Sequence, residues 1–414
     1  MNGFLRRSLL VALSGIALAG CGGGGGSNPP GNSAPTAIVQ PLPMPGPHAV
    51  ACSNVVQDFS KVRAGEEVTS YWEGDPSANG PRYATDLLAD PGNTLIATLN
   101  APQDSNLYGS FAGQEVKFVV LACYPTTDNN PHPDYLLPTG TVVPHMQTGS
   151  DAPLFADVSA RYPVVAYSHG YGGSPLSSDN ILAMSVCASY GYVVIAPLHG
   201  DLRFSDLKID NLASAIAVAS HLDNFTALQA LRPLSISAAL DLVFTHPQWK
   251  DHIDQTRIGG IGASMGGETM LLLGGAGLTT SYPGLSWNQV TRDTRIKAAV
   301  GYVPYFGQPI LPAFGRNQHG LDGINLPFLG ISGTADTTAP IIEAEIGMSR
   351  LTGTRRLVAL SGVTHGFDVA STNDILTWML TFLDAEVRGN PEAIRRLSTM
   401  GSVAGGGDDS VWLY

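Results

Sequence analysis

The chain has 414 residues, of which 44% are hydrophobic and only 14% are charged, a composition that excludes an intrinsically disordered protein. The net charge of −12, without any run of lysine and arginine beyond the first residues, excludes a typical nucleic-acid-binding protein. The cysteines and histidines do not have the spacing of a metal site, so we expect no metal and no cofactor.

The first residues are typical of an export signal. Two arginines precede an apolar segment, residues 9–19, which is too short to span a bilayer. This segment runs into LAGC, residues 18–21, which resembles the lipobox of bacterial lipoproteins. The resemblance implies that residues 1–20 are removed, that Cys21 carries a lipid, and that Gly22 directs retention at the outer membrane. The alternative is a simple secretory signal in which Cys21 has no lipid.

The sequence predicts a tether followed by one domain. Residues 21–49 begin with GGGGGSNPPGNS, a stretch that cannot bury apolar surface and that behaves as a flexible linker. Residues 50–414 are enough for a single large domain with a well-buried core. Lipidated Cys21 is then the only expected contact with a membrane, at the periplasmic side or at the cell surface.

The remaining cysteines suggest one disulfide, because exported proteins can form and keep such bonds. Cys187 lies in the helix-like stretch ILAMSVCASYG, where a free cysteine packs as a small apolar residue. The expected disulfide therefore joins Cys52 to Cys123.

Short apolar runs alternate with helix-like stretches along the domain. Strands are predicted at 116–125, 162–170, 191–200, 257–264, 296–304, 327–333 and 355–362. Helices are predicted at 178–190, 235–245, 265–273, 341–351 and 373–388. This alternation of strands apolar on both faces with helices predicts an α/β fold with a mostly parallel, doubly wound sheet. Ligands of such sheets bind outside the carboxyl ends of the strands.

Three segments fit this pattern poorly. Residues 50–115 are rich in Gly, Pro, Asn and Asp, and we expect edge strands and loops packed on the main sheet. Residues 201–234 are a long insertion after a strand and are predicted to form a small helical cover, or lid, over the site. Residues 401–414 are predicted to be a loosely held tail.

The sequence GASMG places Ser264 between Gly262 and Gly266, with Gly267 next, at the end of a predicted strand and the start of a helix. This context is typical of a nucleophile elbow, in which a serine is held on a tight, strained turn. The helix beginning at Met265 would direct its N–H groups at the reacting centre. The alternative is a glycine-rich turn with a serine that only caps the helix.

A serine nucleophile needs a base, and the base needs an acid that orients it. GTADTTAP places Asp336 just after one predicted strand, and SGVTHGFD places His365 just after the next. Either residue alone would be ordinary on a protein surface. The order Ser264, Asp336, His365, each at the end of a strand, predicts a catalytic triad.

The stretch SHGYGG, residues 168–173, follows an earlier strand and resembles the His-Gly-x-Gly loops that donate an N–H to an oxyanion. We assign the two oxyanion donors to the backbone N–H groups of Tyr171 and Met265, each contributing on the order of 10²–10³ in rate. The loop contains Gly170 and Gly172, and His169 is expected to order it. The alternative is a plain glycine-rich turn.

Together these motifs resemble the α/β-hydrolase superfamily over residues 116–388. Within it the chain is most similar to the dienelactone-hydrolase-like group that includes the platelet-activating-factor acetylhydrolases. The stretches that carry this similarity are CYPTT, YPVVAYSHGYGGSPLSSDNILAMSVCASYGYVVIAPLHGD, RPLSISAALDLVFTHP, RIGGIGASMGGE, GTADTTAP and GVTHGFD. The resemblance implies a serine ester hydrolase with Ser264, Asp336 and His365 as its triad.

The chain is also similar to bacterial polyester hydrolases of the cutinase type, through Gly-Tyr in the oxyanion loop, Ser-Met-Gly-Gly at the elbow and Asp-Thr-x-Ala-Pro at the acid. It departs from both groups at Ala263, where His or Trp is common, and no tryptophan is placed as the polyester group's aromatic clamp. Glu268 adds a carboxylate near the first helical turn, where we expect a structural and not a catalytic role.

Several residues at or after strand ends are candidates for lining the substrate cleft, although core packing is an equal alternative for each. They are Tyr171, His199, Tyr302, Tyr305 and Phe306. No cationic pocket for a carboxylate or phosphate is evident, which favours a neutral ester.

The sequence therefore predicts an exported, lipid-anchored serine carboxylesterase that acts on a small-molecule or polymeric ester. Three alternatives remain: hydrolysis of an amide, thioester or β-diketone by the same triad, depolymerisation of an extracellular polyester, and a non-catalytic binding protein. The acyl chain length, lid motion and oligomeric state do not follow from the sequence.

Overall fold

The computed structural model describes residues 35–53, 88, 92–137, 140–147, 151–201, 222–281, 284–406 and 410–413. The predicted signal peptide, Cys21 and the glycine-rich part of the tether lie outside the described residues.

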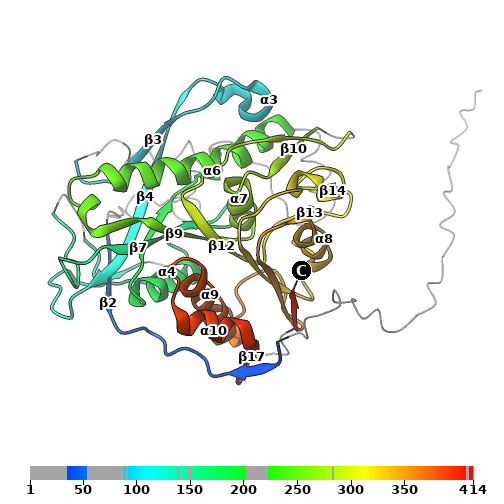
Figure 1. Cartoon of the computed structure of the whole chain (residues 1–414). Helices are drawn as coiled ribbons and strands as arrows, with labels where there is room; N and C mark the ends of the chain where they lie inside the picture. Colours follow the sequence, from blue (N-terminus) through cyan, green and yellow to red (C-terminus); the bar gives the residue numbers. More distant parts are fainter. Residues whose placement is uncertain are drawn as a thin grey trace, which may run out of the picture. The chain divides into compact units, whose positions relative to one another are not determined.

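The described residues form a ten-stranded central sheet in the order β18-β16-β15-β12-β9-β7-β8-β4-β2, with β3 paired to β4 (Figure 1). The strands are β2 (Ala49–Ser53), β3 (Ile96–Asn100), β4 (Glu115–Thr126), β7 (Tyr162–Ser168), β8 (Val193–Pro197), β9 (Ile253–Ala263), β12 (Ile296–Tyr302), β15 (Phe328–Gly333), β16 (Arg355–Leu360) and β18 (Ser410–Leu413). All neighbours from β16 to β8 are parallel, and the antiparallel pairs lie at the two edges. The predicted α/β sheet with mostly parallel strands is confirmed.

Helices cover both faces of this sheet (Figure 1). They are α4 (Ser178–Ser189), α6 (Leu222–Thr245), α7 (Met265–Leu273), α8 (Ile341–Arg350), α9 (Thr372–Glu386) and α10 (Pro391–Thr399). Alternate side chains of β7 enter different cores: Val164 packs with residues of α6, α7 and α8, whereas Val165 packs with residues of α4 and α9. This is why the strands are apolar on both faces.

Shorter strands and helices lie outside the central sheet. The strands are β1 (Ala37–Val39), β5 (Tyr135–Leu136), β6 (Val142–Val143), β10 (Gly277–Ser281), β11 (Ser286–Gln289), β13 (Gly307–Gln308), β14 (Leu311–Pro312) and β17 (Met400–Val403), and the short helices are α3 (Ser105–Tyr108), η3 (Gly109–Phe111), η5 (Lys250–His252), η6 (Arg316–Leu321) and η7 (Val369–Ser371).

Helix α6 corrects one prediction. Residues 222–234 were expected to belong to a cover over the site, but they form the first half of α6, where Phe225 and Leu228 are buried in the core. Residues 202–221, the rest of the expected cover, lie outside the described residues. Among the described residues, one helical segment, Phe225–Thr245, is long and apolar enough to cross a membrane, and 67% of it is buried inside the fold. Packing against the sheet accounts for its apolar composition.

Both ends of the chain extend further into the fold than the sequence indicated. The tether was expected to continue to residue 49, but β1 pairs with β17, and Leu42 N–H donates to Thr377 Oγ1 at 3.1 Å. The C-terminal segment was expected to be a loose tail, but β18 pairs with β16 and closes one edge of the sheet. Backbone pairing with distant strands holds both segments.

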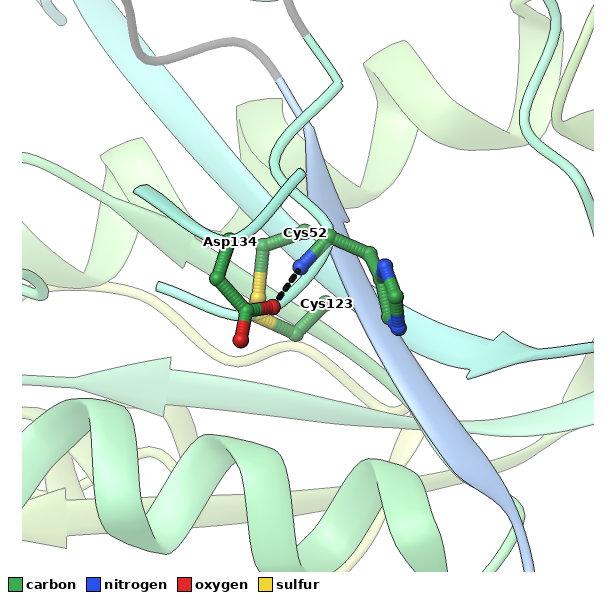
Figure 2. The surroundings of a disulfide bond; sticks show 4 residues. Cys52, Cys123 and Asp134 are labelled. Atoms are coloured by element: carbon green, nitrogen blue, oxygen red, sulfur yellow. Dashed lines mark hydrogen bonds between the residues drawn. A yellow bond between two sulfur atoms is a disulfide. The ribbon is translucent and has the colours of Figure 1, made fainter. Parts of the chain in front are cut away.

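The disulfide joins the antiparallel strands β2 and β4, where Cys52 lies directly opposite Cys123 (Figure 2). Asp134 lies beside it and accepts a hydrogen bond of 3.0 Å from the His145 N–H. Cys187 is a buried free thiol in α4, and burial raises its pKa to about 12. The pairing predicted from sequence is the one in the structure.

Candidate active site

Ser264 occupies the single position between β9 and α7, with a positive φ of 53°. This conformation is strained for a residue with a side chain, so the surrounding backbone must hold it. The Ser264 N–H donates to the carbonyl of Tyr302 at 2.9 Å, and its carbonyl accepts from the N–H groups of Gly267 at 2.8 Å and Tyr305 at 3.0 Å. The turn is thus bonded to the neighbouring strand β12 and to its own helix.

The glycines around Ser264 are required by close backbone contacts. A Cβ on Gly262 would lie 2.0 Å from the Gly266 carbonyl oxygen, and one on Gly266 would lie 1.9 Å from the Ser168 carbonyl oxygen. A Cβ on Gly267 would lie 2.6 Å from the Cβ of Pro304. No side chain fits at these distances, which explains the glycine pattern of the motif.

Three side chains from three strand ends form one hydrogen-bonded chain. The Nε2 atom of His365 lies 3.0 Å from Oγ of Ser264, and its Nδ1 atom lies 2.8 Å from Oδ2 of Asp336. Asp336 follows β15 and His365 follows β16, so the parallel sheet brings all three to one edge.

The Asp336 carboxylate is well placed to orient the imidazole. Its side chain is fully buried, and Oδ1 accepts hydrogen bonds of 2.8 Å from the N–H groups of Thr338 and Ala339. Oδ2 accepts the Nδ1–H of His365, which leaves Nε2 of the neutral ring able to take the Ser264 hydroxyl proton. The ring is 28% exposed, so it is open to a substrate.

Tyr302, the last residue of β12, holds the histidine loop. Its hydroxyl donates to the Gly366 carbonyl at 2.6 Å and accepts from the Asp368 N–H at 3.3 Å. Burial raises the pKa of Tyr302 to about 12, so the hydroxyl keeps its proton. This predicted substrate-lining residue therefore makes two contacts with the loop that carries His365, both just after the histidine.

The predicted oxyanion loop lies against Ser264. A Cβ on Gly170 would lie 3.5 Å from the Cβ of Ser264, so the loop backbone passes beside the serine. Met265 is the first residue of α7, and an N–H at that position has no acceptor within the helix. Gly172 adopts a left-handed φ of 62°, and Tyr171 is half-buried with its ring centroid 5.9 Å from that of Phe225.

Two residues that the sequence analysis overlooked fix this loop. Arg232 of α6 and Asp201 after β8 form a fully buried ion pair at 2.6 Å. The sequence indicates these two residues only weakly: Asp201 follows a strand end, and Arg232 is the only charged residue between Phe225 and Leu240. The sequence pattern does not indicate that the two side chains are in contact.

The other candidates for substrate lining are placed differently from that expectation. His199 is 1% exposed, and its ring bonds the hydroxyls of Ser168 at 2.8 Å and Ser235 at 3.0 Å. Phe306 is also 1% exposed and packs against Phe314 in the core. Tyr305 is 7% exposed and contacts the elbow through its N–H. Their position after strand ends reflects packing beneath the site.

Glu268, in the first turn of α7, is a buried carboxyl group. Its Oε1 accepts a hydrogen bond of 2.6 Å from Gln229, and within the described part of the chain its Oε2 has no hydrogen-bond partner. Burial raises its pKa to about 8, although the Arg232 charge and the Gln229 hydrogen bond act in the opposite direction. Glu268 is therefore neutral at pH 7.

Glu268→Gln is expected to flatten the dependence of stability on pH. The folded-state pKa lies above the ordinary value of 4.5, so the stabilisation from protonated Glu268 is complete below about pH 4.5 and is lost as the pH rises through 8. Between these values the wild type should lose up to about 1.4 kcal/mol of unfolding free energy per pH unit relative to the variant. Urea unfolding from pH 5 to 9 measures this, with the exposed Glu392→Gln as control. Parallel curves for wild type and Glu268→Gln would contradict it.

Over the described ranges, no group of three or more His, Cys, Asp and Glu side chains could hold a metal ion. No protein-family model matches the chain, and no curated protein matches it significantly.

Proposed function

We propose that this protein is a serine hydrolase with the α/β-hydrolase fold that cleaves carboxylic esters through an acyl-enzyme. The observation that carries the proposal is the hydrogen-bonded chain from Ser264 through His365 to Asp336. The strained turn that exposes Ser264 between a strand and a helix also supports it.

In the proposed reaction the Ser264 oxygen attacks the ester carbonyl while His365 Nε2 takes the hydroxyl proton. Asp336 stabilises the imidazolium, and the N–H groups of Tyr171 and Met265 stabilise the negative oxygen of the tetrahedral intermediate. His365 then gives its proton to the departing alkoxide, which leaves as an alcohol. Water attacks the acyl-enzyme with His365 again as base, and the carboxylic acid is released.

We further propose that the enzyme acts outside the cytoplasm, anchored to the outer membrane through a lipid on Cys21. The Cys52–Cys123 disulfide supports export, because such bonds persist mainly in oxidising compartments.

The test uses the full chain with p-nitrophenyl esters from acetate to palmitate and with a fluorophosphonate. We expect the protein to hydrolyse at least one of these esters. This activity should fall in proportion to the fraction of chains that the fluorophosphonate has modified at one site. Mass spectrometry should place the adduct on the peptide that contains Ser264, because this residue is partly exposed and its hydroxyl is bonded to His365. Ser168 and Ser235 are bonded to the His199 ring, but both are fully buried.

Different results would point elsewhere. Labelling of Ser264 without cleavage of any ester would indicate another acyl bond, such as an amide or a thioester. Release of soluble products from a polyester film, with weak activity on small esters, would indicate a depolymerase. A protein that neither reacts with the fluorophosphonate nor hydrolyses an ester would be a binding protein, and the proposal would fail.

A further inference from the structure

The oxyanion loop rests on a buried cation. Arg232 is 1% exposed and is paired with the fully buried Asp201 by two hydrogen bonds, Nε to Oδ1 at 2.9 Å and Nη2 to Oδ2 at 2.6 Å. A buried ion pair of this kind adds little to stability, because desolvation offsets much of the attraction. The position of this ion pair beside the loop suggests a role other than stabilising the fold.

The same guanidinium also donates to two consecutive backbone carbonyls of the loop. Nη1 donates to the His169 oxygen at 2.7 Å, and Nη2 donates to the Gly170 oxygen at 2.9 Å. Charge-assisted hydrogen bonds to carbonyl oxygens are stronger than neutral ones, and the planar guanidinium fixes their directions. Arg232 therefore sets the orientation of two neighbouring peptide groups.

The second of these peptide groups is the one that matters for chemistry. The carbonyl of Gly170 and the N–H of Tyr171 belong to the same trans peptide, so they point in opposite directions. Gly170 lies beside Ser264, and Arg232 binds its carbonyl on the side of α6. We infer that Arg232 is a positioning residue that directs the Tyr171 N–H toward the oxyanion, an inference that rests on the proposed function.

His169 adds a second donor to the same carbonyl. The His199 N–H donates to Nε2 of His169 at 3.1 Å, so Nδ1 carries the proton and donates to the Gly170 oxygen at 2.8 Å. Burial and, to a smaller extent, the nearby Arg232 charge lower the pKa of His169 to about 4, so the ring is neutral at pH 7. The Gly173 N–H also donates to the Gly170 oxygen at 3.2 Å, so three donors hold this carbonyl.

Asp201 completes the arrangement from the other side of the loop. Its Oδ2 accepts the Gly172 N–H at 2.9 Å, so one ion pair holds backbone groups on both sides of Tyr171. Burial alone would raise the pKa of Asp201, but the charge and hydrogen bonds of Arg232 lower it below its ordinary value. The carboxylate therefore stays ionised and keeps the guanidinium in place. Hydrogen bonds to the Gly170 oxygen also polarise its peptide, which makes the Tyr171 N–H a better donor.

The decisive variant is Arg232→Met combined with Asp201→Asn, because removing both charges leaves no unpaired ion in the core. We expect kcat per active site, counted by fluorophosphonate labelling to completion, to fall at least tenfold, up to the roughly 10²–10³ produced by losing one oxyanion donor. KM should change less than threefold, and the affinity for a trifluoromethyl ketone, which forms a tetrahedral adduct, should fall in parallel with kcat. Arg232→Lys, which keeps the charge but not the fork of donors, should give an intermediate loss.

The matched control is Arg295→Met combined with Asp293→Asn. These residues form a bidentate pair at the opposite end of β12 from the elbow, with an Nε–Oδ1 distance of 2.8 Å. The control should lower stability without changing kcat per labelled site. An unchanged kcat per site in the Arg232/Asp201 variant, together with an active wild type, would overturn the inference and leave the proposed function intact. A wild-type protein that hydrolyses no ester would contradict both the proposed function and this inference.

Discussion

Replacing Ser264 with alanine is expected to lower kcat/KM for ester hydrolysis by roughly 10⁶, the size of effect seen when a triad nucleophile is lost. Ser264 Oγ lies 3.0 Å from the imidazole nitrogen that would accept its proton, and the methyl group of alanine can neither attack nor donate. Folding should be unaffected, because the backbone bonds of the elbow do not involve the hydroxyl. Steady-state kinetics with the best p-nitrophenyl ester measures the loss.

The double variant Ser264→Ala with His365→Ala should be no slower than Ser264→Ala alone, within a few-fold. Residues that act as one unit are strongly non-additive, because the base has no task once the nucleophile is gone. Ser185→Ala is the control, since this serine lies in α4 and its hydroxyl has no hydrogen-bond partner within the described structure. A further large drop in the double variant would show that His365 acts independently of Ser264.

Gly266→Ala should prevent the elbow from forming and lower the free energy of unfolding by more than about 4 kcal/mol. The new Cβ would lie 1.9 Å from the Ser168 carbonyl oxygen. This oxygen cannot move aside easily, because Ser168 is the last residue of β7 and is in register with Gly262 of β9. The clash involves two central strands, so relaxing it would displace both Ser264 and the predicted oxyanion loop.

Urea unfolding and thermal denaturation of Gly266→Ala measure this loss. Gly284→Ala is a matched control, because its Cβ would meet no atom closer than 3.4 Å, an ordinary van der Waals contact. A Gly266→Ala protein with wild-type stability and activity would mean that the close packing of β7 and α7 is not as described.

The positions of the strands and helices could be predicted because burial on both faces of the sheet gives the sequence a strong local pattern of apolar residues. Helix α7 was predicted at the residues where it occurs, and β15 was predicted to within one residue. The glycine pattern around Ser264 was equally local, since each glycine avoids a clash with backbone from the elbow or a neighbouring strand end. Asp336 and His365 could be proposed as its partners because parallel strands place their carboxyl ends at one edge.

Features that depend on contacts between residues far apart in the chain could not be predicted from the sequence. The first half of α6 looked like a cover because it follows a strand without a clear helix start, and only its burial shows that it belongs to the core. The edge strand β18 looked like a tail because its glycine-rich approach is typical of loops. A single edge strand has little pattern of its own, and its partner, β16, decides whether it forms.

The sequence by itself determined the class of fold and the identity of the three side chains that can act together, because both follow from periodicity and from motifs at strand ends. The tertiary structure alone decided that Arg232 and Asp201, 31 residues apart in the chain, meet beneath the predicted oxyanion loop, and that the His199 side chain is buried and does not line a cleft. A buried ion pair has no sequence period, and each partner is stable there only because the other is present. Such pairs become visible only when the packing of distant elements is known.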